Sequence, residues 1–449
     1  MNLKRILTGA GLLGIALGFG SSAASVWAAP QAAGQAGQAK PGSYTMAEYN
    51  QYQAADKEQN PQAKVKALDD FVKAYPNSTL MPYIYRDYYQ TYMALKNFAQ
   101  AIEYCDRMIA LGDQIDTTGK LEAYYMRAQA YYLGSGADKT MQATDAATKA
   151  RDASAAGLKV LDDLKKPDNV DQKQFDTQKK GVQVLFNAVA ALASTFMKDY
   201  PAAAASYKTV LSITPDDPVT HYRLGIVDLQ VTPPAASDGF WELARAIDLK
   251  IPNDAQVRAY LKNQIVRYQQ PACDKLVDDQ VTELLTLAAT ATDRPATLNV
   301  PSAADLQKAR DDTANFIPNL VAGGDAGKVM WLASCGLEYP DVGVRVMEAP
   351  DVQGDNVTLR VFRGNTPEEI EAATMANMTV KVEGQPEAKK LEKDAVVRFT
   401  GTLTGYTQSP FMLTWEKAKI NMEDLPEDKG PAKKGAAKKA PAKKAAPSN

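Results

Sequence analysis

Histidine is nearly absent from this chain, since His221 is the only one among 449 residues. A Ser-His-Asp triad, a histidine-rich metal site and a histidine general base would all depend on that single side chain. Its neighbours place His221 on the packing side of a predicted helix, where we expect a hydrogen-bonded structural role. The sequence therefore predicts a protein that is not an enzyme, with no catalytic residue, no metal site and no cofactor.

Cysteine is also scarce, and the three residues lack the paired spacing of a zinc site. Cys105 occupies an apolar position of a predicted helix, where we expect it to be buried. Cys273 and Cys335 can either form a disulfide in an oxidising compartment or remain free thiols, because the sequence does not give the distance between their Cα atoms.

Long apolar runs are missing apart from Ile6–Phe19, which follows the basic pair Lys4-Arg5. Small residues at Val26 and Ala28 match the positions that a signal peptidase reads. We expect a cleaved signal peptide and a periplasmic or secreted protein with no integral membrane span after its removal. The alternative, a retained membrane anchor, is disfavoured because the apolar run is too short to span comfortably.

The two ends of the chain differ from its body in charge. Residues 429–449 contain seven lysines and no acid, so the body is acidic although the whole chain has 51 basic and 53 acidic side chains. Lysine, alanine and proline cannot build a core, and we expect a disordered tail. Such a tail either increases solubility or binds an anionic envelope polymer.

Small and aromatic residues recur at a step of 34 positions. The motif Ala67-x3-Phe71 is followed 34 residues later by Ala101-x3-Cys105. A small residue lets two helices approach closely, while an apolar or aromatic residue fills the adjoining groove. A step of this length predicts a stack of helix pairs.

These residues resemble the tetratricopeptide repeat (TPR) family, over roughly residues 48–252. The same step separates Ala191 from Gly225, and His221-x2-Leu224-Gly225 is the best match to the first-helix pattern of the family. The segment Ala67–Thr79 is similar to the Phe-x-x-x-Tyr-Pro-x-Ser repeat ending of envelope TPR proteins. The resemblance implies a solenoid whose first helices line a concave protein-binding groove.

After Pro340 the apolar residues alternate with polar ones, as in β-strands. We expect five short strands, the last two joined by a turn at Ser409-Pro410. The stretch that ends in these two strands is similar to OB-like domains of the tRNA-anticodon-binding type in secreted bacterial proteins. In this reading Phe399 and Leu403 face the core, and Arg398 faces outward.

The fold class that follows is mainly α, a TPR-type α-solenoid with a helical bridge, then a small five-stranded OB-like β-barrel and a disordered basic tail. The expected organisation is a signal peptide at 1–28, a flexible linker at 29–43, the solenoid at 44–252, the bridge at 253–339, the barrel at 340–424 and the tail at 425–449.

Tyrosine is concentrated in the first repeats, where part of it should serve packing and part should face the groove. Tyrosine combines a large contact area with a polar tip, which suits binding hot spots. The alternative is that all these tyrosines pack between irregular repeats. The repeat geometry directs the following residues towards the groove: Tyr49, Tyr52, Tyr83, Arg86, Gln90, Tyr125, Gln129, Tyr132 and Tyr222.

The leading functional prediction is an exported, non-enzymatic scaffold that binds a protein or peptide partner in the periplasm or cell envelope. The alternative is a polyanion-binding envelope protein that uses the outer face of the barrel and the tail. The residues expected to serve that alternative are Arg360, Phe362, Lys381, Arg398, Lys433, Lys434, Lys438, Lys439, Lys443 and Lys444.

Overall fold

The computed structural model describes residues 44–354 and 356–426, which divide into two compact units. The first unit contains residues up to 265 together with 278–300, and the second contains 266–277 together with the residues from 301 onwards. The predicted signal peptide, the linker at 29–43 and the lysine pairs of the tail lie outside the described residues. Among those described, no helix combines the length and the apolar character needed to cross a membrane.

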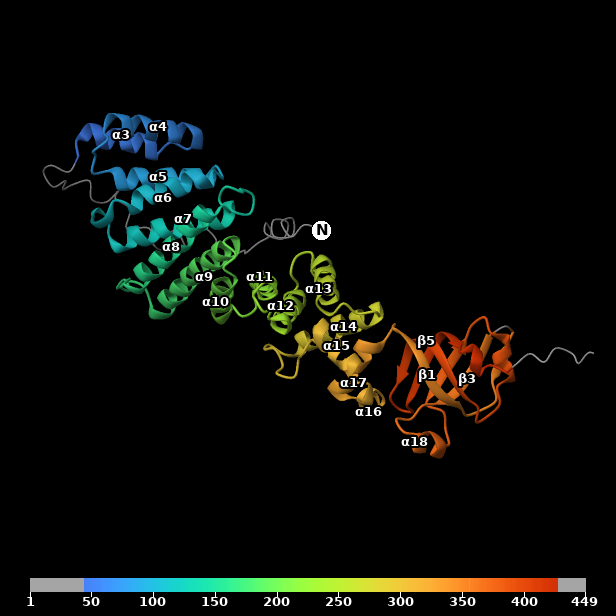
Figure 1. Ribbon diagram of the computed structural model, residues 1–449. Coiled ribbons are helices and arrows are strands. Elements are labelled where there is room, and N and C mark those ends of the chain that lie inside the picture. Colours follow the sequence, from blue (N-terminus) through green and yellow to red (C-terminus); the bar gives the residue numbers. More distant parts are fainter. Residues whose placement is uncertain (1–43, 355, 427–449) are drawn as a thin grey trace, which may run out of the picture. The chain divides into compact units, whose positions relative to one another are not determined.

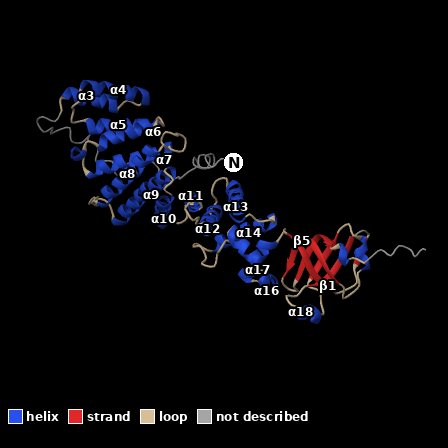
Figure 2. Ribbon diagram, in the orientation of Figure 1, coloured by secondary structure: helices blue, strands red, loops and turns tan. Residues whose placement is uncertain are grey.

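The first unit consists of packed antiparallel helices, which follow one another in pairs (Figure 1; Figure 2). Their bounds are α3 Met46–Asp56, α4 Pro61–Ala74, α5 Met81–Ala94, α6 Phe98–Ile109, α7 Thr117–Gly134, α8 Thr144–Asp162, α9 Gln172–Phe196, α10 Tyr200–Ile213, α11 Pro218–Asp228 and α12 Ala236–Asp248, with a 3-10 turn at Gly112–Gln114.

Short polar residues at the helix starts explain why the chain turns where it does. The side chains of Asn60, Asp116 and Asp171 each accept a hydrogen bond from a backbone N–H of the first turn of their helix. Proline follows directly at Pro61 and Pro218, where a missing N–H costs nothing. These caps keep the connections short, so consecutive helices pack side by side.

Residues 34 positions apart occupy equivalent buried places, as the sequence step predicted. Phe71 in α4 and Cys105 in α6 are both fully buried and belong to one hydrophobic core with Tyr88 and Tyr89. Gly225 in α11 lies so close to α12 that an added Cβ would stand 2.8 Å from the carbonyl oxygen of Gly239. Small residues therefore set the distance between α11 and α12.

Five further helices follow: α13 Asp254–Gln269, α14 Asp274–Thr290, α15 Ala303–Asp311, α16 Phe316–Ala322 and α17 Gly324–Ser334, with a 3-10 turn at Thr313–Asn315. The start of α15 is a capping box, in which Ser302 and Asp305 bond reciprocally. Cys273 and Cys335 form a disulfide within the second unit, with Cα atoms 5.6 Å apart.

The second unit ends in a small mixed sheet of six strands, shown in red in Figure 2. The elements are β1 Glu338–Val346, β2 Asp351–Gln353, β3 Asn356–Phe362, α18 Pro367–Ala372, β4 Met378–Val382, β5 Val396–Thr407 and β6 Met412–Ile420, with 3-10 turns at Pro386–Lys390 and Met422–Asp424. The strand order is β1-β5-β6-β4-β3-β2, and β1 also pairs with β3. Only the β4–β6 pair is parallel.

The sequence predicted five strands, and β2 is the additional one. Its three residues are all exposed and pair only with β3. A strand of three residues without a buried face has no alternating pattern to detect. The predicted facing of β5 is confirmed, because Phe399 and Leu403 are fully buried beside Trp415.

The close contact at Gly225 predicts that adding a single methyl group at this position destabilises the protein. Gly225→Ala should lower the free energy of unfolding by roughly 1–3 kcal/mol, because the new methyl group meets backbone atoms of α12. Chemical denaturation measures the change. Gly136→Ala, at a position with nothing within 4 Å, is the matched control, and equal effects of the two substitutions would contradict the close contact.

The disulfide predicts a thiol count. Protein purified without reductant and then denatured should expose one reactive thiol, that of Cys105, and three after reduction. Three reactive thiols in both samples would show that Cys273 and Cys335 are not joined.

Candidate functional site

The predicted groove residues of α3 and α5 include an aromatic pair on the protein surface. The rings of Tyr52 and Tyr83 lie 6.1 Å apart, and Tyr83 is 39% exposed. Tyr49 stacks on Tyr44 and accepts a hydrogen bond from Gln53. The structure thus brings Tyr52 and Tyr83 together and leaves one of the two rings accessible.

Arg86 connects α5 to α7 through a residue that the sequence analysis did not single out. Its guanidinium lies 2.8 Å from Glu122, which also accepts a hydrogen bond from the fully buried Tyr89. The predicted Gln90 is exposed on α5. Arg86 is therefore engaged by the protein, and its surface charge is largely compensated.

The predicted residues of α7 behave differently from one another. The hydroxyl of Tyr132 accepts a hydrogen bond of 2.9 Å from Arg223, whose guanidinium also lies over the ring, so α7 is linked to α11. Tyr125 and Gln129 are partly buried on α7. Tyr222, on α11, is only 3% exposed and is not brought to the surface with the others.

A buried acid lies beside the aromatic pair. Asp87 is 6% exposed, and its Oδ1 atom lies 3.3 Å from Nζ of Lys64. Burial raises the pKa of Asp87 to about 6, although Lys64 acts in the opposite direction. Asp87 follows Tyr83 by four residues, the spacing of one helix face, but no sequence signal showed that the carboxyl group would be buried.

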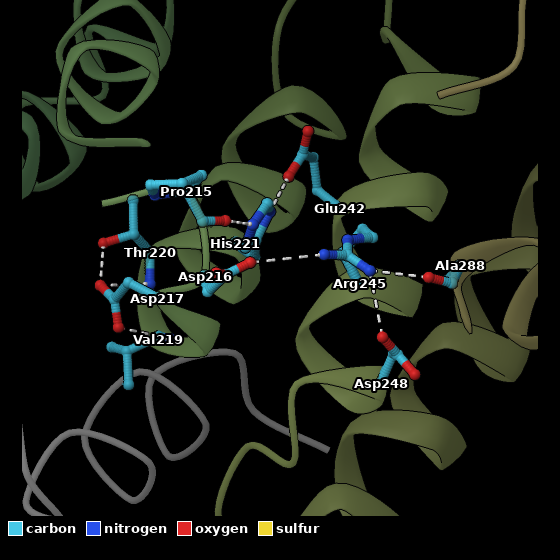
Figure 3. A network of polar contacts seen from close by, with 10 residues as sticks. All are labelled: Pro215, Asp216, Asp217, Val219, Thr220, His221, Glu242, Arg245, Asp248 and Ala288. Atoms are coloured by element: carbon cyan, nitrogen blue, oxygen red, sulfur yellow. Dashed lines mark hydrogen bonds and ion pairs between the residues drawn. The ribbon is translucent and has the colours of Figure 1, made fainter. Parts of the chain in front are cut away.

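His221 belongs to the polar network shown in Figure 3, as the sequence analysis expected of a structural residue. Its Nδ1 atom lies 2.5 Å from Glu242, and its Nε2 atom lies 2.8 Å from the carbonyl oxygen of Pro215. The ring is 6% exposed. Both ring nitrogens thus lie within hydrogen-bonding distance of protein oxygens.

Arg245 continues this network towards α14. It donates to Asp248 at 3.0 Å and to the carbonyl oxygen of Ala288 at 2.7 Å, and it faces Asp216 at 3.8 Å (Figure 3). These contacts hold α12 against α14 and the turn before α11. No group of three or more potential metal ligands occurs in residues 44–354 and 356–426.

Asp228, at the end of α11, is a second buried acid. It is 3% exposed, and its Oδ2 atom has no hydrogen-bond partner in the described part of the chain. Burial raises the pKa of Asp228 to about 7; Lys208 opposes the shift, and Glu242 adds to it. At neutral pH this carboxyl group is poised between its two protonation states.

The cations predicted on the outer face of the sheet all face carboxylates. Lys381 lies 2.8 Å from Glu416, and Arg398 lies 3.1 Å from Asp424. Arg360 has Glu348 at 3.9 Å. An anionic ligand on this face would compete with these pairs. Phe362 is partly buried, and the predicted tail lysines lie outside the described residues.

Two cavities of about 650 and 610 Å³ lie against α6, α7 and the start of α8. The larger one includes two arginines, but Arg107 is paired with Glu103 and Arg127 with Asp106. No residue predicted from the sequence to bind a ligand lines either cavity.

The buried acid at Asp228 predicts a pH-dependent stability difference. The folded-state pKa lies above the ordinary value of about 3.9, so the folded chain keeps a proton that the unfolded chain releases. The stability that proton binding to Asp228 contributes to the folded state is complete below about pH 4 and is lost as the pH rises to about 7. Above that pH the contribution changes no further. Asp228→Asn cannot ionise and should exceed the wild-type stability at pH 8, by about 4 kcal/mol at most.

The measurement is chemical denaturation of both proteins from pH 4 to pH 8. Asp168→Asn, at an exposed residue, is the control and should follow the wild type throughout. A stability difference between Asp228→Asn and wild type that stays constant with pH would contradict the assigned ionisation.

Comparison with known proteins adds no relative to these observations, since no protein-family model, no curated protein and no solved structure matches this chain.

Proposed function

We propose that the first unit is a TPR-type solenoid and that the sheet is an OB-like barrel. The antiparallel pairing of α3 to α12 supports the first assignment, together with the equivalent burial of Phe71 and Cys105 at a step of 34 residues. The pairing of β1 with both β5 and β3 supports the second, because β1, β3, β4, β5 and β6 then each have at least two neighbours.

We propose export to the periplasm or cell envelope. The disulfide between Cys273 and Cys335 supports an oxidising compartment. The basic pair, the apolar run and the small residues at the start of the sequence are typical of a cleaved signal peptide.

In that compartment the protein acts as a non-enzymatic scaffold that binds a protein or peptide partner. The observation that carries this proposal is the aromatic pair Tyr52–Tyr83, with one exposed ring beside a charged cluster that links α3, α4 and α5. Exposed tyrosine next to fixed polar groups is typical of binding hot spots. The engagement of both nitrogens of His221 supports a function without catalysis.

The polyanion-binding alternative has less support. Its three cations on the sheet are each opposed by a carboxylate, which reduces their attraction for an anion. No contact among residues 44–354 and 356–426 favours it over the scaffold function, and the tail lysines lie outside these ranges.

A photo-activated cross-linking amino acid at a single position tests the scaffold function in intact cell envelopes. Placed at Tyr83, it should give a defined cross-linked protein adduct, because this ring is exposed on the proposed binding face. The control position is Val352, which is 45% exposed on β2 of the other unit. The same adduct at both positions, or none at Tyr83, would contradict a partner on this face.

A further inference from the structure

The two cavities of the first unit adjoin each other. Ala99 of α6 and Met141, in the connection between α7 and α8, line both the cavity of about 650 Å³ and the one of about 610 Å³. The cavities therefore form one continuous depression between α6 and the start of α8, which we call the α6–α8 groove. The buried residues Arg127 and Tyr131 of α7 lie at its floor.

The groove presents apolar surface that a partner can reach. Ala99, Ala137 and Ala143 are exposed, and Phe98 and Ile102 are only partly buried. Alanine side chains are short, so they leave the space between the two helices open. Because most of the lining residues are exposed or partly buried, the groove suits a segment of polypeptide better than a small molecule, which buries most of its surface.

Two carboxylates of the groove are already paired with arginines. Glu103 lies 2.6 Å from Arg107 on the same helix, and Asp106 lies 2.5 Å from Arg127. These four side chains compensate one another and contribute little net charge to the groove.

Three lysines of the groove have no such partner. Lys96, Lys139 and Lys149 are exposed, and none of them forms an ion pair with a residue of 44–354 or 356–426. Of the remaining acids, Asp138 accepts hydrogen bonds from Thr140, and Asp145 lies in the first turn of α8, where the helix N–H groups stabilise it. The lining thus holds five cationic and four acidic side chains, a positive excess within an acidic body.

We propose that the α6–α8 groove binds an acidic amphipathic helix of a protein partner. Apolar side chains on one face of that helix lie against Ala99, Ile102 and Ala143, and its carboxylates reach Lys139 and Lys149. This inference rests on the proposed scaffold function and adds a second contact surface to it, since neither Tyr52 nor Tyr83 lines the groove.

The segments of this chain outside the described residues do not have that chemistry. Residues 1–43 contain no acidic side chain, and residues 427–449 contain only Glu427 and Asp428 beside seven lysines. The acidic helix therefore has to come from another protein.

The probe is a fluorescein-labelled peptide in which Glu-Ala-Leu-Leu-Glu-Ala-Leu occurs twice, so that leucines follow one face of a helix. Fluorescence anisotropy with the full chain should show saturable binding that weakens as the salt concentration rises. The same peptide with lysine in place of glutamate should not bind, because it meets the unpaired lysines of the groove.

Charge reversal tests the contact with the lysines. Lys139→Glu and Lys149→Glu should each weaken binding about fivefold, the range of an exposed ion pair. Lys173→Glu, at an exposed lysine of α9 outside both cavities, changes the net charge equally and should bind like the wild type.

A longer side chain tests the groove itself. Ala99→Gln should weaken binding about tenfold, because it fills the position that both cavities share. The matched control is Ala205→Gln, at an exposed alanine of α10, which should leave binding unchanged. All of these substitutions are at exposed positions, and circular dichroism checks that each variant is folded.

Absence of binding, equal binding of the lysine peptide, or equal effects of Lys149→Glu and Lys173→Glu would overturn the inference. Sedimentation of the protein alone should show a monomer; a dimer that Lys149→Glu dissociates would place a second copy in the groove and overturn the assignment to another protein. The scaffold function would survive either result if Tyr83 still gives its cross-linked adduct in the envelope. Loss of that adduct while the acidic peptide still binds would overturn the partner face at Tyr83 alone.

Discussion

Close approach between paired helices is the constraint on which the first unit depends. At Gly225 and Gly239 the helices α11 and α12 come so near that no side chain fits between them. Each helix buries its apolar face only against its neighbours, as in other stacked architectures. Charged residues caught between such layers cannot reach solvent and must find partners across the helix contact. Arg86 with Glu122, Arg127 with Asp106 and His221 with Glu242 all satisfy this requirement.

The same constraint produces buried acids with raised pKa values. Asp87 and Asp228 are buried between packed helices, and one carboxylate oxygen of each lacks a hydrogen-bond donor in the described part of the chain. Burial raises the pKa of Asp87 to about 6 and that of Asp228 to about 7. At Asp228 the neighbouring charges are those of Lys208, Glu242 and Asp238, and the effect concerns stability. At Asp87 the acid is buried as well, while the ring of Tyr83, one helical turn before it, is exposed.

Much of this architecture follows from the sequence, because spacing encodes local contacts. The 34-residue step located Phe71 and Cys105 in one core, and alternation located Phe399 and Leu403 in another. The partners of the charged residues did not follow. Glu122 is 36 residues from Arg86, and nothing in the sequence pairs two residues at that separation. Tyr222 was expected at the surface with the other tyrosines but is buried, since its exposure depends on neighbouring helices.

The outer face of the sheet and the surface around Tyr52 and Tyr83 on α3 and α5 show why the type of residue does not determine a binding function by itself. Both carry aromatic and charged residues, and the sequence assigned ligands to both. On the sheet, Arg398 has three carboxylates within 4 Å, so its positive charge is already balanced by acidic groups of the protein itself. On the helices, a carboxylate oxygen of Asp87 lacks a donor and Tyr83 is accessible. The accessible group on α3 and α5 is thus the aromatic ring of Tyr83, whereas the cations of the sheet are already paired with carboxylates.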